Sequence, residues 1–257
     1  KHLITTQIEH HAVLHTCKAL EKEGYKVTYI GVDERGIVKL SELEAAIDDD
    51  TALVAVMMAN NEIGTIQPIK EIVRIAHSKG VLVFTDAVQA VGAIPVNVQD
   101  LGVDLLALSG HKFHAPKGIG ALYVRKGVRL QSLIDGGGQE RGRRGGTENV
   151  AMAVALAKAL EIAVAKLPEN DRIVAMRDRL IDGLMKIPHT ILNGDRSQRL
   201  PGNVNVAFEF IEGESLILLL DRAGIYASTG SACSTASLDP SHVLLALGLP
   251  HEKAHGS

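Results

Sequence analysis

The sequence predicts an α/β protein built on a mostly parallel sheet. Short apolar, β-prone segments alternate along the first half of the chain with segments whose apolar residues recur at helical spacing, which is the pattern of βαβ units. With 257 residues, 46% of them hydrophobic, the chain is long enough to bury a sizeable core. Polar side chains follow three of the apolar segments, at strand ends where open α/β sheets bind ligands.

The elements of the first half are predicted from these apolar runs and the residues that interrupt them. Residues 10–24 carry Val13, Leu14 and Cys17 at helical spacing and end at a glycine suited to a C-terminal cap, so Cys17 is interpreted as a core residue. The predicted strands are 3–6, 26–31, 52–58, 81–85 and 105–108, and the further predicted helices are 40–47 and 69–79.

A smaller α+β unit is predicted after residue 149. An alanine-rich helix is expected at 150–166, and Pro168 is expected to open a second helix that continues to about residue 186. We therefore expect a large domain at 1–149 and a small domain at 150–257. The remaining predicted elements are strands at 190–192 and 204–208, a helix at 214–223, and a helix that Asp239-Pro240-Ser241 starts and that runs through residue 247.

Composition excludes several classes of protein. The net charge of -3 gives no general argument for nucleic-acid binding. No apolar run reaches the roughly 18 residues of a transmembrane helix, and the N-terminus has no basic-then-apolar signal. Two cysteines, Cys17 and Cys233, are too few for a disulfide framework, which favours a reducing compartment, of which the cytoplasm is the simplest. The histidines and cysteines lack ligand spacing, so no metal site is expected.

A lysine follows the predicted strand 105–108. Ser109-Gly110 ends the apolar run and His111-Lys112 comes directly after it. A lysine at a buried strand end would have a lowered pKa, which is what an amine needs to form a Schiff base with an aldehyde. The same segment is equally compatible with a β-hairpin that carries a lysine in its loop, because a second apolar run follows at 121–124.

An aspartate stands at the end of the neighbouring predicted strand. Asp86 follows the apolar run 81–85, and Gln89 comes three residues later. Aspartate and lysine at strand ends are the pattern expected for pyridoxal 5'-phosphate (PLP), because the carboxylate keeps the pyridine nitrogen protonated while the lysine carries the aldehyde. The alternative for Asp86 is a helix N-cap.

Seven motifs extend this pattern over nearly the whole chain. In order they are T-T-Q-I-E-H-H (5–11), N-N-E-I-G (60–64), T-D-A-V-Q (85–89), S-G-H-K (109–112), P-K-G-I-G (116–120), G-G-G-Q-E-R-G-R-R-G-G-T-E-N (136–149) and S-T-G-S-A-C-S-T-A-S-L-D-P-S-H-V-L-L-A-L-G (228–248). Together they resemble the cysteine desulfurases of the NifS/IscS type, PLP-dependent enzymes of the class V aminotransferase family. The resemblance implies the PLP-dependent transferase fold type I, which is aspartate aminotransferase-like.

The resemblance also implies roles for single residues around the cofactor. His10, the first histidine after Glu9, would stack on the PLP ring, although a histidine that caps a helix start is the alternative. Asn61 would bond near the cofactor oxygen and the substrate, although loop asparagines usually satisfy turns. Gln89 would bond the cofactor's phenolic oxygen.

The glycine-rich segment 136–146 is expected to bind an anion. Its six glycines and three arginines make it too flexible for regular structure and too basic for a bare linker. Nucleic acid is a weaker alternative, because no aromatic residue is interleaved to stack bases. By resemblance, Ser109 and His111 bind the PLP phosphate of their own subunit and Thr147 touches that of the neighbouring subunit. This implies a two-fold homodimer.

Small residues surround the second cysteine at 228–238. A thiol among Ser, Thr, Ala and Gly has no apolar neighbours to pack it, so we expect a mobile loop with Cys233 accessible as a nucleophile. A free surface cysteine without a role is the alternative. The loop length resembles that of the longer-loop desulfurases, whose cysteine travels between the PLP site and an acceptor protein.

The activity implied is conversion of L-cysteine to L-alanine with a persulfide on Cys233, which would pass to iron–sulfur cluster scaffolds or thiolation enzymes. Lys112 would remove the α-proton, and His10 could donate and accept protons over the ring face. A selenocysteine lyase or another aminotransferase-fold enzyme would keep Lys112 and Asp86, and a sulfur-relay or interaction module without turnover is also possible.

The chain also resembles an incomplete family member. Members carry an earlier phosphate-binding segment and, just beyond the position of Ser257, an arginine that binds the substrate carboxylate; this sequence contains neither. We therefore expect weak PLP retention and poor turnover.

Overall fold

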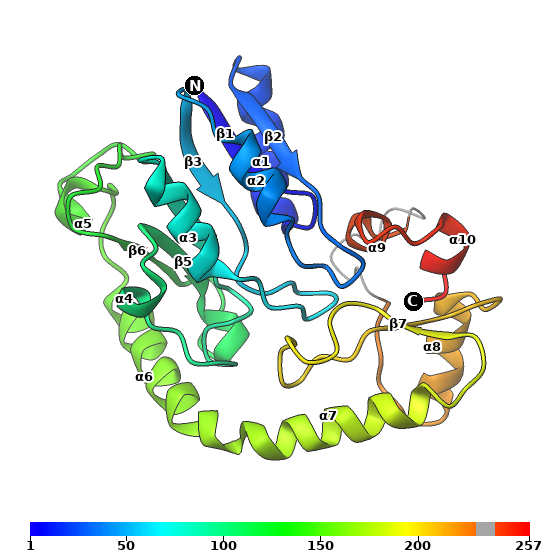
Figure 1. The fold of residues 1–257 in the computed structure, drawn as a ribbon. Coiled ribbons are helices and arrows are strands. Elements are labelled where there is room, and N and C mark those ends of the chain that lie inside the picture. The colour runs from blue at the N-terminus through cyan, green and yellow to red at the C-terminus, as the bar shows by residue number, and fades with distance from the viewer. Residues whose placement is uncertain (230–239) are drawn as a thin grey trace.

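The computed structural model describes residues 1–229 and 240–257 and contains a six-stranded and a two-stranded sheet (Figure 1). The large sheet has the order β2-β1-β3-β4-β5-β6. Strands β1 to β5 are parallel and β6 is antiparallel to β5, so the predicted mostly parallel α/β fold is confirmed. The strands are β1 (His2–Thr6), β2 (Lys26–Ile30), β3 (Thr51–Ala55), β4 (Leu82–Asp86), β5 (Leu105–Ser109) and β6 (Gly120–Val124).

The predicted strand 52–58 is too long, because β3 ends at Ala55. Val56 and Met58 still donate backbone hydrogen bonds to β4, to Phe84 O at 3.1 Å and Asp86 O at 2.8 Å. Residues 56–58 are buried where the chain leaves the sheet. Their apolar character therefore reflects burial and not membership of the strand.

Helices join the parallel strands and cover both faces of the large sheet. Right-handed crossovers place α1 on one face and α2 to α4 on the other, and α2 packs against α3. The amphipathic pattern of α3 buries Ile72 and Ala76 completely, whereas Arg74 is outside the core. The helices are α1 (His11–Lys22), α2 (Leu40–Ala46), α3 (Ile69–Ser78) and α4 (Val98–Leu101), and Cys17 of α1 is buried as predicted.

The C-terminal half continues from the sheet into a long helical arc (Figure 1). The predicted helix 150–166 is confirmed, but the next helix begins at Asn170 and ends at Leu184, after a 3-10 turn, rather than running from Pro168 to residue 186. The strand predicted at 204–208 starts at Val206. The elements are α5 (Gln139–Gly142), α6 (Val150–Lys166), η2 (Leu167–Glu169), α7 (Asn170–Leu184), β7 (Thr190–Leu192), β8 (Val206–Phe208), α8 (Gly213–Arg222), α9 (His242–Ala246) and α10 (His251–Ala254), the last not predicted.

The expectation that residues 136–146 lack regular structure needs one correction. A single helical turn, α5, lies inside the segment. Glu140 and Arg141 within it have φ angles of 49° and 59°, so its backbone departs from a regular helix, in keeping with the glycine content.

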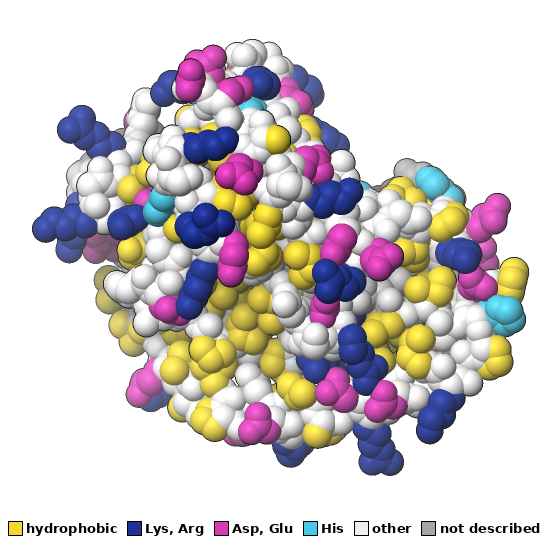
Figure 2. All heavy atoms as spheres, in the orientation of Figure 1, with side chains coloured by type: hydrophobic (Ala, Val, Ile, Leu, Met, Phe, Trp, Pro, Cys, Tyr) yellow, Lys and Arg dark blue, Asp and Glu magenta, His cyan; other side chains and the backbone are white. Residues whose placement is uncertain are grey.

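Helix α6 is apolar but contains no buried residue. Leu156 and Ala163 pack against the large core, whereas Val150 and Val154 are 66% and 65% exposed. On the face shown in Figure 2, hydrophobic side chains gather above the arc of α6 and α7, and charged side chains of both signs are interspersed elsewhere. An exposed apolar helix of this kind is typical of a surface that contacts another protein segment.

The carboxylate of Asp104 fastens β5 to its neighbours. It is buried and accepts hydrogen bonds from His77 Nε2 and Val83 N, both at 2.8 Å, and from Arg125 Nη1 at 3.2 Å. Burial alone would raise the pKa of Asp104, but these hydrogen bonds outweigh it and hold the pKa below its usual value.

We expect Asp104→Asn to destabilise the protein by about 2 kcal/mol, because the amide cannot accept all three bonds. Since the folded pKa is depressed, the contribution of Asp104 is present above the unfolded pKa of the carboxyl and is lost as the pH falls through the folded value. Urea unfolding at pH 7 and pH 3 measures both effects. Asp100→Asn is the control, because Asp100 forms an exposed pair with Lys70 and should change stability by less than about 1 kcal/mol. Equal effects of the two substitutions would contradict this role.

Candidate active site

Four of the predicted site residues follow four neighbouring parallel strands. His10 comes after β1, Asn61 after β3, Asp86 ends β4, and Lys112 comes after β5. The chain moves outward from β1 to β2 and then returns to β3, so the strand order reverses between β1 and β3. In open α/β sheets, ligands bind outside the carboxyl ends of the strands at such a reversal.

Two of these four residues, Asn61 and Lys112, line one cavity together with the predicted Gln89. Asn61, Gln89 and Lys112 border a cavity of about 910 Å³, within the range of small-molecule sites. Helices α6 and α7 and the segment 200–203 complete its walls. An amine and two amides therefore face a common space at the carboxyl edge of the sheet.

The backbone around Lys112 is fixed by close packing. Lys112 lies in a 3-10 turn, η1 (Gly110–Phe113), directly after β5, and η1 packs against α6. A Cβ atom at Gly110 would lie 2.7 Å from Leu156 Cδ1, so only glycine allows this approach. The buried setting predicted for Lys112 is wrong, because its side chain is exposed in the described structure. The neighbouring Phe113 is the buried residue of the turn, and it packs in the large core.

Asp86 and His10 interact electrostatically, and neither of them lines this cavity. Asp86 is 9% exposed; burial raises its pKa, whereas a hydrogen bond from Val88 N at 2.9 Å and the charge of His10 lower it. That hydrogen bond makes a turn after β4 and not the N-cap considered as the alternative. The alternative for His10 does hold, since its Nδ1 accepts from Ala12 N and caps α1. A cap on the helix leaves the ring face free to contact a ligand.

Glu9 is a functional candidate that the sequence patterns did not single out. It is fully buried next to His10, and its Oε1 accepts from Thr6 Oγ1 at 2.7 Å and from Met57 N at 2.9 Å. Burial, with a smaller contribution from the charge of Asp86, raises the pKa of Glu9 to about 8, although the hydrogen bonds from Met57 N and Thr6 Oγ1 lower it. A glutamate between the apolar Ile8 and a histidine was the available signal, but the partner that helps to bury it, Met57, lies 48 residues away, just after β3.

The remaining predicted residues are distributed differently. Ser109 Oγ and His111 Nδ1 lie 2.8 Å apart beside Lys112, as a phosphate-binding pair would. Thr147 is exposed in the loop before α6 and does not line the cavity. Cys233 lies outside the described residues.

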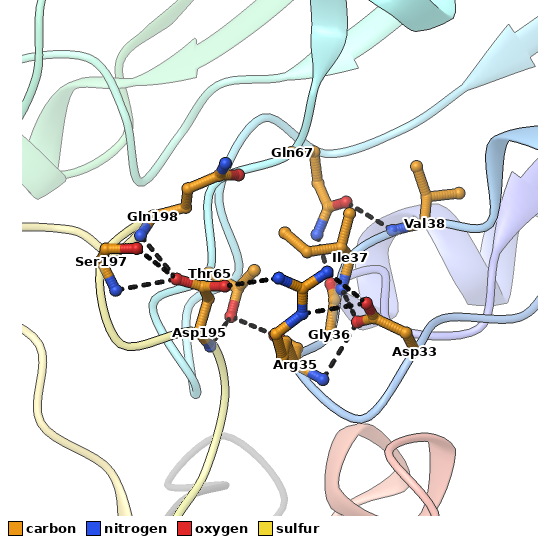
Figure 3. Close-up of polar contacts among 10 residues, drawn as sticks. All are labelled: Asp33, Arg35, Gly36, Ile37, Val38, Thr65, Gln67, Asp195, Ser197 and Gln198. Atoms are coloured by element: carbon orange, nitrogen blue, oxygen red, sulfur yellow. Dashed lines mark hydrogen bonds and ion pairs between the residues drawn. The ribbon is translucent and has the colours of Figure 1, made fainter.

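The loop that presents Asn61 is held by the C-terminal half of the chain. Thr65 Oγ1 donates to Arg35 O at 2.8 Å and accepts from Asp195 N at 3.0 Å (Figure 3). Arg35 in turn pairs with Asp33 at 2.9 Å and lies 3.6 Å from Asp195. Gly64, at φ 71°, lies so close to Asn203 that a side chain would collide with it. This network joins the predicted large and small domains directly behind the cavity wall.

Glu62 adds a second link from this loop to the end of the chain. Its buried carboxylate accepts a hydrogen bond from Ser241 Oγ, the N-cap of α9, and burial raises the pKa of Glu62 to about 7. His242 Nε2 lies 3.0 Å from Glu9 O, so α9 is attached to the loops after both β1 and β3.

The described residues contain neither a metal-binding cluster nor a membrane-spanning helix. Within residues 1–229 and 240–257, no group of three or more His, Cys, Asp or Glu is arranged to hold a metal ion. In the same residues, no helix combines the length and the apolar character needed to cross a membrane.

Comparison with known proteins identifies the family. The sequence profile described as Aminotransferase class-V matches residues 1–250. The chain belongs to the class V aminotransferase family. Enzymes of this family depend on PLP, as the motifs predicted.

Individual class V relatives match the whole chain. The "Cysteine desulfurase IscS" of Methanosarcina thermophila is 61% identical over 258 residues, and that of Clostridium botulinum strain Hall is 58% identical over 260, in each case over 100% of this chain. The chain spans 64% and 66% of the lengths of those two proteins.

Solved class V structures agree with the fold. A structure titled "NIFS-LIKE PROTEIN" superposes with a TM-score of 0.91 at 46% identity, covering 100% of this chain and 68% of that one. One titled "SspA in complex with cysteine" has a TM-score of 0.84 at 37% identity, covering 99% and 71%. The predicted PLP fold type I is therefore confirmed.

The residues at the edge fit the family's cofactor chemically. A PLP site needs an amine for the aldehyde, a carboxylate for the ring nitrogen and polar groups for the phenolic oxygen and phosphate. Lys112, Asp86, Gln89 and the Ser109–His111 pair supply these groups from adjacent strand ends. A buried Asp86 with a raised pKa would be stabilised as a carboxylate by a cationic ring nitrogen.

Proposed function

We propose that this protein is a PLP-dependent cysteine desulfurase, converting L-cysteine to L-alanine with transfer of sulfur to Cys233. The observation that carries the proposal is the cavity bordered by Lys112, Asn61 and Gln89, which follow the carboxyl ends of β5, β3 and β4. Identity of 61% to a cysteine desulfurase across the whole chain, and likeness to a structure titled as a complex with cysteine, support L-cysteine as the substrate.

The proposed binding roles follow from the chemistry of each group. PLP, when bound, supplies an aldehyde and an electron-accepting ring. Lys112 would hold the aldehyde carbon, Asp86 would keep a proton on the ring nitrogen, and His10 would lie over the ring face. Gln89 and Asn61 would bond the phenolic oxygen and the substrate. Ser109 and His111 would hold the phosphate.

In the proposed reaction, Lys112 moves protons and Cys233 accepts sulfur. The amine of Lys112 removes the α-proton of cysteine and later returns a proton to carbon. The Cys233 thiolate attacks the substrate sulfur, so an S–S bond forms and the C–S bond breaks. The electron pair of the broken bond stays with carbon, which takes a proton and becomes the methyl group of alanine. Cysteine and one protein thiol thus yield alanine and one persulfide, without an external oxidant or reductant.

We also propose two kinds of partner, sulfur-acceptor proteins and a second copy of this chain. Persulfide sulfur would pass to iron–sulfur scaffolds or other sulfur-acceptor proteins in the cytoplasm, where reducing conditions keep Cys17 and Cys233 as thiols. We propose a homodimer in which Thr147 reaches the neighbouring phosphate site. The exposed apolar side chains of α6 and of the loop before it, with Leu133 96% exposed, support such an interface.

The test is a product balance on the PLP-treated protein. With L-cysteine we expect alanine and protein-bound sulfane sulfur to appear in a ratio of about one to one before any reductant is added. Pyruvate in place of alanine would indicate elimination. Alanine formation from L-selenocysteine alone would favour a selenocysteine lyase. Absence of all turnover in a protein that carries PLP on Lys112 would overturn the proposed activity.

A further inference from the structure

Glu9 lies directly before His10 in the chain and interacts electrostatically with Asp86, but it has no part in the chemistry proposed above. Its carboxyl group is completely buried between the ends of β1 and β3. Oε1 accepts two hydrogen bonds, from Thr6 Oγ1 and Met57 N, whereas the buried Oε2 has no hydrogen-bond partner among residues 1–229 and 240–257. An ionised carboxylate with one solvated or bonded oxygen is common, but one with a dry, unpartnered oxygen is strongly disfavoured.

Within the part of the chain that the structure describes, no cationic side chain bonds to the carboxylate of Glu9 to balance a negative charge. Asp86 on β4 carries the same charge sign, and Cys17 on α1 is a buried thiol. His242 on α9 contacts the backbone oxygen of Glu9, and burial lowers the pKa of His242, which favours the neutral ring. His10, the adjacent residue, contributes its charge to Asp86.

Two interacting carboxyl groups in one buried site divide their protons according to their surroundings. Asp86 has a backbone donor, the charge of His10 and, once PLP is bound, a ring nitrogen opposite it. Glu9 is buried more deeply and has an orphaned oxygen. Of the two carboxyl groups, Glu9 is therefore the one that would keep its proton, and Asp86 the one that would carry the negative charge.

We propose that Glu9 is a positioning residue that acts as a neutral carboxylic acid, holding the turn before His10 against Met57 and leaving Asp86 as the ionised partner of this carboxyl pair, available to the PLP ring nitrogen. The PLP half of this inference rests on the proposed function, whereas the neutral state of Glu9 does not. Ionisation of Glu9 would bring water to Oε2, loosen its contacts with Thr6 and Met57, and displace His10.

The first test measures the neutral state in the protein without PLP. Since the pKa of Glu9 is raised from 4.5 in the unfolded chain to about 8, the folded protein keeps a proton that the unfolded chain releases. Stability from this group is complete below pH 4.5 and falls as the pH rises to 8, with up to a tenfold increase in the unfolding constant per pH unit. We expect Glu9→Gln to remove this component and the exposed Glu23→Gln to retain it. Parallel pH profiles for wild type and Glu9→Gln would overturn the proposal.

The second test measures the PLP dissociation constant from cofactor absorbance between pH 7 and 10. Every other group is common to the wild type and Glu9→Gln, so the ratio of their dissociation constants isolates Glu9. We expect equal affinity at pH 7 and, above pH 8, up to tenfold weaker binding per pH unit in the wild type relative to Glu9→Gln. Weaker binding by Glu9→Gln at pH 7 would overturn the neutral-acid role.

Two further variants keep these tests decisive. Glu9→Ala removes the acceptor as well as the acid, and should bind PLP at least tenfold more weakly than Glu9→Gln. If Glu9→Gln does not fold, Glu9→Asp must keep the wild-type pH slope, and its loss would overturn the proposal. If the wild type fails to bind PLP through Lys112, the proposed function fails, and the unfolding comparison still decides whether Glu9 is neutral.

Discussion

Replacing Lys112 with alanine should abolish covalent attachment of PLP and lower turnover by about 10²- to 10⁴-fold or more, because the same amine holds the cofactor and moves the α-proton. Lys112 borders the cavity together with Asn61 and Gln89, and the packing of Gly110 against α6 fixes the turn from which it projects. Borohydride reduction followed by peptide mapping should place the pyridoxyl label of the wild type on Lys112. The label should be absent in Lys112→Ala.

Lys117 provides the matched control, because it is an exposed lysine in the same loop, five residues along. Lys117→Ala should keep the label and the visible absorbance of the bound cofactor. A wild-type label on Lys117, or on any lysine outside η1, would contradict the assignment. Loss of label in both variants would instead indicate that the loop as a whole is needed.

The sheet and its strand ends could be predicted because they depend on local patterns. Alternation of apolar runs and helical spacing indicated β1 to β5, and the polar residues after three of these runs indicated the binding edge. The predicted ends of strands and helices were less accurate, because an apolar residue indicates burial but not whether a strand, a helix or a loop contact buries it. Residues 56–58 show this, since they are buried without belonging to β3.

The parts that could not be predicted depend on contacts between distant residues. Glu9 meets Met57 across 48 residues, and Ser241 meets Glu62 across 179. No local sequence pattern indicates such a distant partner, so the burial of Glu9 and Glu62 could not be predicted. The exposure of Lys112 was missed for a related reason: η1 turns its side chain out of the sheet towards walls formed by α6 and α7, more than 40 residues later.

Cysteine substitution should separate cofactor binding from sulfur transfer. In PLP-loaded protein, Cys233→Ser should abolish persulfide formation and alanine release from L-cysteine, because a serine hydroxyl cannot accept sulfur at neutral pH. Attachment of PLP to Lys112 should be unchanged. The measurements are sulfane-sulfur content, alanine by chromatography and cofactor absorbance on the same sample.

Cys17→Ser is the matched control for this experiment. Cys17 is buried in α1, and burial together with the charge of Glu21 raises its pKa, so its thiol is a poor nucleophile at neutral pH. A buried serine there should reduce stability by about 1–3 kcal/mol while turnover per PLP-bound protein stays within about twofold. Equal loss of persulfide in both variants would show that Cys233 is not the sole acceptor. Persulfide retained in Cys233→Ser and lost in Cys17→Ser would reverse the assignment, and would require the core around α1 to open during turnover.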